Sequence, residues 1–172
     1  FMPITAGGGV RSLDTVKRLL RNGADKVAIG AAIYSHPDLV RECSSALGAQ
    51  AIVAVIETQN GKVHQPGKDW PMLDPVDHAI HLEMSGAGEI LLMSRDRDGT
   101  LEGYDLACIE QVARVVHIPL IAAGGAGLFG LGTAIMGPII ASLREVLGHF
   151  DEFSKASDRT GATTEDLSAL AY

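Results

Sequence analysis

Residues 89–105 read Glu-Ile-Leu-Leu-Met-Ser-Arg-Asp-Arg-Asp-Gly-Thr-Leu-Glu-Gly-Tyr-Asp, and this stretch is the most informative about the fold of the chain. The apolar run at 90–93 predicts a buried strand of a parallel sheet. A loop carrying two aspartates, Asp96 and Asp98, follows it directly. Polar groups at the C-terminal end of such a strand lie where α/β barrels place their active sites. The stretch therefore predicts a parallel α/β fold with a site at the strand end.

Strand and helix patterns alternate along the first 127 residues. We expect strands at 2–6, 26–30, 51–57, 89–94 and 119–123, and helices at 13–21, 37–47, 75–85 and 106–116. Such alternation is typical of βαβ units with a parallel sheet. The glycine-rich turn at 4–9 is echoed at 121–127, and repeated βα units favour a barrel over an open sheet. The sequence predicts an α/β fold, namely a partial (βα)8 TIM-barrel-type fold with about five parallel strands.

The domain organisation changes near residue 127. Residues 1–127 are expected to form an incomplete TIM-barrel domain. Residues 128–172 are expected to form an apolar helical segment followed by a polar tail rich in Ser, Thr, Asp and Glu. Within the barrel part, Asp74 before Pro75 predicts a helix N-cap with proline at the first helical position.

The net charge and the two cysteines of the chain indicate which partners and which cellular compartment to expect. The net charge of −7 argues against nucleic acid as a partner, because phosphate backbones require a basic face. Cys43 and Cys108 lack metal-ligand spacing, so we expect a reduced cytoplasmic protein that holds no metal. No Asp, Glu, Lys or Arg occurs at 115–143, but the prolines and glycines there favour strand and loop over a membrane span. The chain opens on an expected strand rather than on a signal peptide.

Several motifs resemble the cyclase subunit family of imidazole glycerol phosphate synthase. The resemblance covers residues 1–127 and rests on Ile-Thr-Ala-Gly-Gly-Gly-Val-Arg-Ser-Leu at 4–13, Gly-Ala-Asp-Lys-Val at 23–27, Gly-Ala-Gly-Glu-Ile-Leu-Leu at 86–92, Asp-Arg-Asp-Gly-Thr at 96–100, Glu-Gly-Tyr-Asp at 102–105 and Ile-Pro-Leu-Ile-Ala-Ala-Gly-Gly-Ala-Gly at 118–127. That family is a (βα)8 barrel. It takes ammonia from a glutaminase partner, closes the imidazole ring of imidazole glycerol phosphate and releases an aminoimidazole carboxamide ribotide.

The resemblance implies a lyase-type cyclase of histidine biosynthesis, provided that the barrel is complete. Its substrate would be a phosphorylated ribotide, its partner a glutaminase subunit, and no cofactor is expected. The sequence departs from the family at several points. The first two strands are absent, with an essential Asp on the first, and no eighth strand is recognisable after Gly127. Glu57 stands where the family has a catalytic Asp, Gly30-Ala31 where it has Asn-Thr, and Ala123 where it has Ser.

Asp98 and Glu57 are the candidate catalytic residues. Carboxylates on two sides of a ring can transfer protons in both directions. The resemblance implies that Asp98 lies at the active-site mouth, and Glu57, at the end of its strand, would be the opposing carboxylate. Alternatively, both are solvated residues at strand ends. The extra methylene of Glu57 would displace its carboxylate by ~1.5 Å relative to an Asp, and small misplacements can slow a reaction ~10²-fold. Asp96 is expected to act either in the site or as loop structure, paired with Arg95 or Arg97.

Glycines at the strand ends are the candidate phosphate-binding residues. Without a Cβ atom, backbone amides can approach an anion closely. Arg11 follows the first of these turns. The alternative is that these turns need glycine for conformation alone. The candidates are Gly8, Gly9, Gly30, Gly99, Gly124 and Gly125.

Two weaker patterns point to other chemistry. Residues 125–130 fit G-x-G-x-x-G, but no strand bearing a ribose-binding acid clearly follows. His78 and His81 lie three apart on an expected helix beside Glu83. We interpret them as a solvated helix face rather than a metal site.

Three functions remain open. The first is the cyclase reaction. The second is a paralogous role in surface-sugar amidation, to which Leu-Asp-Pro-Val at 73–76 is also similar. The third is a non-catalytic phosphate-binding scaffold or remnant. Because five strands cannot close an eight-stranded barrel, we expect either a homo-oligomer that completes the sheet or a chain cut from a longer protein.

Overall fold

The computed structural model of the chain describes residues 2–67 and 73–126. All of them belong to the first of the chain's two units, Phe1–Gly130. The helical segment and polar tail expected at 128–172 lie outside the described residues, so the domain boundary at 127 stays a prediction.

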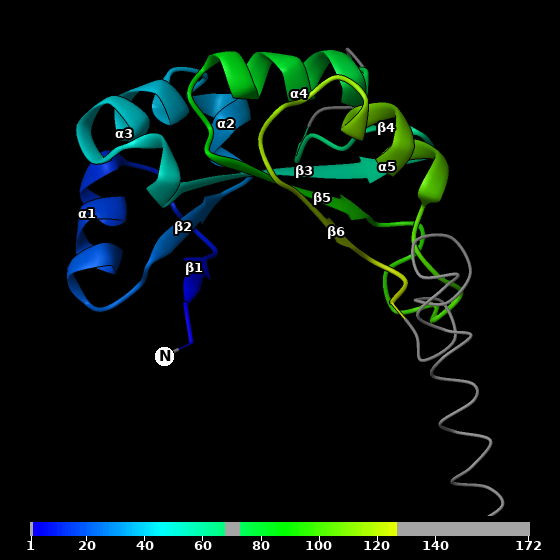
Figure 1. The fold of residues 1–172 in the computed structure, drawn as a ribbon, viewed down its shortest axis with the longest axis horizontal. Helices are drawn as coiled ribbons and strands as arrows, with labels where there is room; N and C mark the ends of the chain where they lie inside the picture. The colour runs from blue at the N-terminus through cyan, green and yellow to red at the C-terminus, as the bar shows by residue number, and fades with distance from the viewer. Residues whose placement is uncertain (1, 68–72, 127–172) are drawn as a thin grey trace, which may run out of the picture. The chain divides into compact units, whose positions relative to one another are not determined.

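A parallel sheet is the centre of this unit (Figure 1). Its strands run in the order β1-β2-β3-β5-β6, and every neighbouring pair in that order is parallel. These strands are β1 (Thr5–Gly7), β2 (Lys26–Ile29), β3 (Ile52–Gln59), β5 (Glu89–Ser94) and β6 (Leu120–Ala123). The helices are α1 (Leu13–Arg21), α2 (Ala32–Ser35), α3 (Leu39–Leu47), α4 (Pro75–Met84) and α5 (Leu106–Ala113), with a 3₁₀ turn at Ala49–Ala51. The prediction of about five parallel strands with intervening helices is confirmed.

Element ends differ from the predicted ends by a few residues, and two short elements were not predicted. These are α2 and the strand β4 (Lys62–Val63), which pairs antiparallel with β3. Asn60 and Gly61 connect the two strands with φ values of 52° and 71°. A two-residue turn with positive φ at both positions is the type I′ hairpin that Asn-Gly favours. The dipeptide was therefore a usable sequence signal for this hairpin.

The helix α4 begins as predicted. Asp74 is its N-cap, and Pro75 occupies the first turn. The Asp74 side chain accepts a hydrogen bond from the Val76 backbone N–H at 2.9 Å. That bond lowers the pKa of Asp74, and so does the hydrogen bond from Lys62. An N-cap of this kind satisfies one of the free amides of a helix's first turn.

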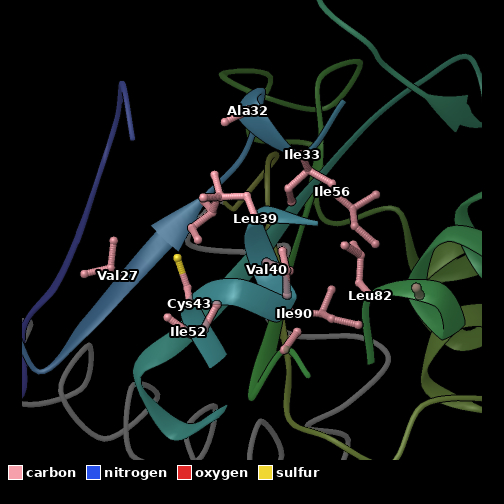
Figure 2. Close-up of a cluster of buried hydrophobic side chains, with 14 of the residues drawn as sticks. Val27, Ala32, Ile33, Leu39, Val40, Cys43, Ile52, Ile56, Leu82 and Ile90 are labelled. Carbon is pink, nitrogen blue, oxygen red and sulfur yellow. The ribbon is translucent and has the colours of Figure 1, made fainter. Parts of the chain in front are cut away.

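The hydrophobic core lies between the sheet and the helices. Figure 2 shows Leu39, Val40 and Cys43 of α3 beside strand residues such as Ile52 and Ile90. The fully buried large side chains are Val16, Val27, Ile29, Leu39, Val40, Ile52, Val53, Ile56, Thr58, Leu82, Ile90 and Val112. Most of the aliphatic residues that set the strand and helix periods therefore pack into one core.

The opposite face of the sheet is less buried than the core face. Along β5, Ile90 and Leu92 are buried, while the alternating residues Leu91 and Met93 are only half-buried. Successive side chains of a strand point to opposite faces. The strand that the apolar run predicted to be buried is thus buried on its core face and half-buried on the other face. Five parallel strands do not form a closed barrel, so that face stays partly open within the described residues.

His78 on α4 is a correction to the sequence interpretation. It is buried, with 8% of its surface exposed, rather than part of a solvated face. It lies four residues before the buried Leu82, so both side chains fall on the same side of the helix. Its ring stacks on that of Tyr34, with the ring centroids 5.5 Å apart. Burial, and to a smaller extent the neighbouring His81, lowers the pKa of His78 to about 4.

We therefore predict that His78 makes the protein less stable in mild acid. The unfolded chain binds a proton at this residue below its ordinary pKa of 6.5, whereas the folded chain does so only near pH 4. Stability is therefore lost progressively as the pH falls from 6.5 toward 4, by about 2 kcal/mol at pH 5. His78→Phe keeps a ring against Tyr34 and should remove this loss. Urea unfolding at pH 7 and pH 5 measures the difference.

The matched control is His117→Phe, because the His117 side chain is 92% exposed. This variant should keep the pH dependence of the parent protein. An equal loss of stability at pH 5 in the His78→Phe variant and the parent would contradict the prediction.

Candidate active site at the carboxyl ends of the strands

A cavity of about 390 Å³ opens at the carboxyl ends of β1, β2 and β3. The carboxyl ends of parallel strands share one edge of a sheet, where α/β barrels hold their active sites. Four of the predicted site residues line this cavity, namely Gly8, Gly9, Gly30 and Glu57. The tertiary structure thus brings together four of the eight predicted site residues. The outermost of these four, Gly8 and Glu57, are 49 positions apart in the sequence.

Gly8 and Gly9 form a turn with positive φ at both residues. Their φ values are 93° and 67°, a region that other residues rarely adopt. A Cβ atom on either residue would meet nothing within 4 Å. The turn therefore has open space in front of it, and Arg11 also lines the cavity. Such a turn can supply amide donors to a phosphate, and the charge of Arg11 would favour the anion.

Glu57 extends from β3 into the mouth of the cavity. It lies two residues after the half-buried Val55 on the sheet face away from the core, and its register partner on β5 is Met93. The Arg95 guanidinium donates a hydrogen bond to Oε2 of Glu57 at 2.9 Å. The Arg95 side chain is 44% exposed, and the Glu57 side chain is 34% exposed. Glu57 is therefore an ion-paired carboxylate rather than a freely solvated one.

Asp98 and Gly99 lie in the exposed loop that follows β5. Among residues 2–67 and 73–126, no hydrogen bond or ion pair involves the Asp98 carboxylate. Asp98 does not line the cavity that contains Glu57. Because β3 and β5 are neighbours in the sheet, Glu57 and Asp98 lie near the ends of adjacent strands. The structure does not place the two carboxylates in one common cavity.

The turn after β6 packs closely against β5 and its loop. Gly124 and Gly125 have φ values of 86° and 88°. A Cβ atom on Gly124 would lie 2.3 Å from the backbone oxygen of Ser94. The Gly103 N–H donates to the Gly125 oxygen at 2.8 Å. The structure therefore gives Gly124 and Gly125 a packing role. Their phosphate-binding role stays a prediction.

Asp96 has a structural partner that the sequence did not indicate. It was expected to pair with Arg95 or Arg97, but its Oδ2 accepts a hydrogen bond from the Asn60 backbone N–H at 2.6 Å. The pairing follows from the β3–β4 hairpin, which carries Asn60 beside the end of β5. Arg95 in turn was missed as a partner of Glu57, since nothing in the local sequence relates residues 38 positions apart.

The described residues show neither a metal-binding cluster nor a membrane-spanning helix. In the described part of the chain, no group of three or more His, Cys, Asp or Glu side chains is placed to hold a metal ion. Among the described helices, none is both long and apolar enough to cross a membrane.

A comparison with known protein families shows the family of the chain. The model of a protein family described as "Histidine biosynthesis protein" matches residues 1–129. The chain belongs to this family. Members of the family are TIM barrels, so the parallel sheet and its helices form a partial (βα)8 barrel, as the sequence predicted.

Two curated members of the family are similar over most of the chain. "Imidazole glycerol phosphate synthase subunit HisF" of Alkaliphilus metalliredigens (strain QYMF) is 37% identical over 162 residues, which cover 90% of this chain and 64% of that protein. The protein with the same description in Legionella pneumophila is 46% identical over 133 residues, or 74% of this chain and 63% of that protein. The chain therefore spans slightly less than two thirds of the length of either relative.

Proposed function

We propose that this chain is a cyclase subunit of imidazole glycerol phosphate synthase. In that reaction it closes the imidazole ring with ammonia and releases an aminoimidazole carboxamide ribotide. The observation that carries the proposal is the cavity at the strand ends, which Glu57 lines together with Gly8, Gly9 and Gly30. A proton-transferring carboxylate next to amides that can hold a phosphate is what ring closure on a phosphorylated ribotide requires.

Within this proposal the two carboxylates transfer protons. Glu57 acts from the end of β3, and Asp98 acts from the loop after β5. The exposed position of Asp98 and its lack of partners among the described residues leave its carboxylate free to contact a substrate. The glycines at the ends of β1 and β2 hold one phosphate through backbone amides, and Gly99, Gly124 and Gly125 hold the second. This assignment keeps each predicted site residue at the same edge of the sheet.

The proposed partners follow from the same function. A glutaminase subunit supplies the ammonia, in keeping with the names of the two relatives, which are subunits of a synthase. In the described sheet, β1 and β6 each pair with one other strand only. A barrel of this family needs further strands between them, and these come either from additional chain or from a second copy in a homo-oligomer.

Turnover and binding together test the proposed function. The purified chain is incubated with the phosphorylated ribotide substrate and ammonium, and both products are sought by mass spectrometry. Appearance of both products supports the cyclase function. Binding of the ribotide in calorimetry without any product would instead favour the phosphate-binding scaffold, a function with which the ion-paired state of Glu57 is also compatible.

We further predict that Gly9→Ala weakens ribotide binding by about 10-fold. The left-handed conformation costs a residue with a Cβ roughly 1–2 kcal/mol, so the turn relaxes and its amides lose their alignment. Calorimetric titration with the ribotide measures the loss. Gly23→Ala is the control, because Gly23 also has a positive φ, 100°, and open space around it, but lies at the end of α1. Equal weakening in both variants would contradict a binding role for Gly9.

A further inference from the structure

The loops that follow β3 and β5 are held together by three hydrogen bonds. The Arg95 backbone N–H donates to the Thr58 oxygen at 2.9 Å, extending the pairing of the two strands by one residue. The Asn60 backbone N–H donates to Asp96 at 2.6 Å. The Arg95 side chain donates to Glu57 at 2.9 Å. The first of these bonds fixes the Arg95 backbone against β3, and the second ties the neighbouring Asp96 side chain to the Asn60 backbone, so the base of the Arg95 side chain is held in place.

The Arg95 side chain is the only group that holds the carboxylate of Glu57 among the described residues. The Glu57 backbone is fixed separately, by its place in β3 and by the His64 N–H, which donates to its oxygen at 2.7 Å. A glutamate side chain has several rotatable bonds and loses considerable freedom when it is ordered. A guanidinium is planar, permanently charged and directional in its hydrogen bonds, which suits it to orienting a carboxylate.

Other charged or ionisable groups near Glu57 do not replace Arg95. Tyr34 of α2 interacts with it electrostatically, since burial and then the Glu57 charge raise the pKa of the phenol to about 12. Arg11 lines the same cavity, but no ion pair joins it to Glu57 in the described part of the chain. The orientation of the carboxylate therefore depends on Arg95. Half-exposed ion pairs contribute little to the free energy of unfolding. The main effect of this pair is therefore on the orientation of the Glu57 carboxylate.

We propose that Arg95 is a positioning residue, which orients the Glu57 carboxylate toward the substrate cavity. This inference rests on the proposed function of Glu57. Arg95 itself does not contact the reacting atoms. Its removal should leave the fold and the substrate affinity largely unchanged and should slow the chemical step, because a displaced carboxylate transfers protons poorly.

A double-mutant cycle tests the kinetic consequence. Arg95→Leu is expected to lower kcat about 10–100-fold with KM changed by less than about 3-fold. Arg95→Lys, which keeps a charged donor, should restore part of that loss. In the Glu57→Gln background, Arg95→Leu should change kcat by less than about 3-fold, because residues that act as a unit are non-additive. Arg97→Leu is the control, since Arg97 lies in the same loop with 43% exposure and should leave kcat unchanged.

A second measurement does not need turnover. In the ¹H–¹⁵N spectrum, a guanidinium held by a carboxylate should show slowly exchanging side-chain N–H signals. These Arg95 signals should be present in the parent protein and lost in Glu57→Gln. Their absence in the parent would overturn the orientation proposal.

The outcomes separate the two proposals. Turnover in the parent with independent, additive effects of Arg95→Leu and Glu57→Gln would leave the cyclase function standing and overturn the role of Arg95. A rise in KM at constant kcat would overturn it too, in favour of direct substrate binding. Failure of the parent to turn over would overturn the cyclase function alone, and the N–H signals would then decide whether Arg95 orients Glu57.

Discussion

Replacing Asp98 by asparagine is expected to lower the rate of ring closure by about 10²–10⁴-fold, the usual contribution of a positioned acid or base. The amide keeps the size of the side chain but carries no charge and cannot act as a general acid or base near neutral pH. Mass-spectrometric quantification of both products against time measures the rate. The melting temperature should stay within about 1 °C of the parent value, because exposed substitutions without partners rarely alter stability.

Glu102→Gln is the matched control for this experiment. Glu102 lies in the same loop and is 72% exposed, and its nearest ion-pair contact, with Arg97, is 3.9 Å long. It should therefore keep the full rate. A rate for Asp98→Asn equal to that of the control would remove Asp98 from the proposed mechanism. A parallel loss in both variants would show that the loop needs its negative charge rather than one particular carboxylate.

Gly124→Ala is expected to destabilise the protein by about 3 kcal/mol. Two causes add: the left-handed conformation costs a Cβ-bearing residue roughly 1–2 kcal/mol, and forcing close-packed groups apart costs roughly 1–3 kcal/mol. The new Cβ would lie 2.3 Å from the Ser94 oxygen, a backbone atom that cannot rotate away. The ends of β5 and β6 would therefore have to separate. Urea unfolding measures the free energy, and a melting curve should show a midpoint lower by about 10 °C.

Comparing the free energies of unfolding of Gly124→Ala and Gly23→Ala isolates the cost of the contact between the new Cβ and the Ser94 oxygen. Gly23 has a φ of 100°, and a Cβ there would meet nothing within 4 Å. That variant should lose only the conformational part, about 1–2 kcal/mol. Equal destabilisation of the two variants would show that the packing of Gly124 against β5 has no energetic effect. If Gly124 also holds a phosphate, ribotide affinity in the folded fraction of Gly124→Ala should fall as well.

Much of the fold could be predicted because its signals are local. The period of apolar residues and the cap at Asp74-Pro75 each depend on residues a few positions apart. The strand of residues 89–94 was predicted with the ends it has in the structure. The candidate site could be placed at one edge of the sheet for the same reason, since the carboxyl ends of parallel strands follow from the strand pattern alone.

The alternation of strands and helices, the class of fold and the edge at which we propose the site thus follow from the sequence alone. The tertiary structure decided which side chains meet there. Glu57 and Arg95 are paired because β3 and β5 are neighbours in a register that aligns Glu57 with Met93. His78 is buried because the face of α4 that carries Leu82 packs on the core. Such contacts depend on strand order, register and helix orientation, which are set by the collective packing of the core and not by any short stretch of residues.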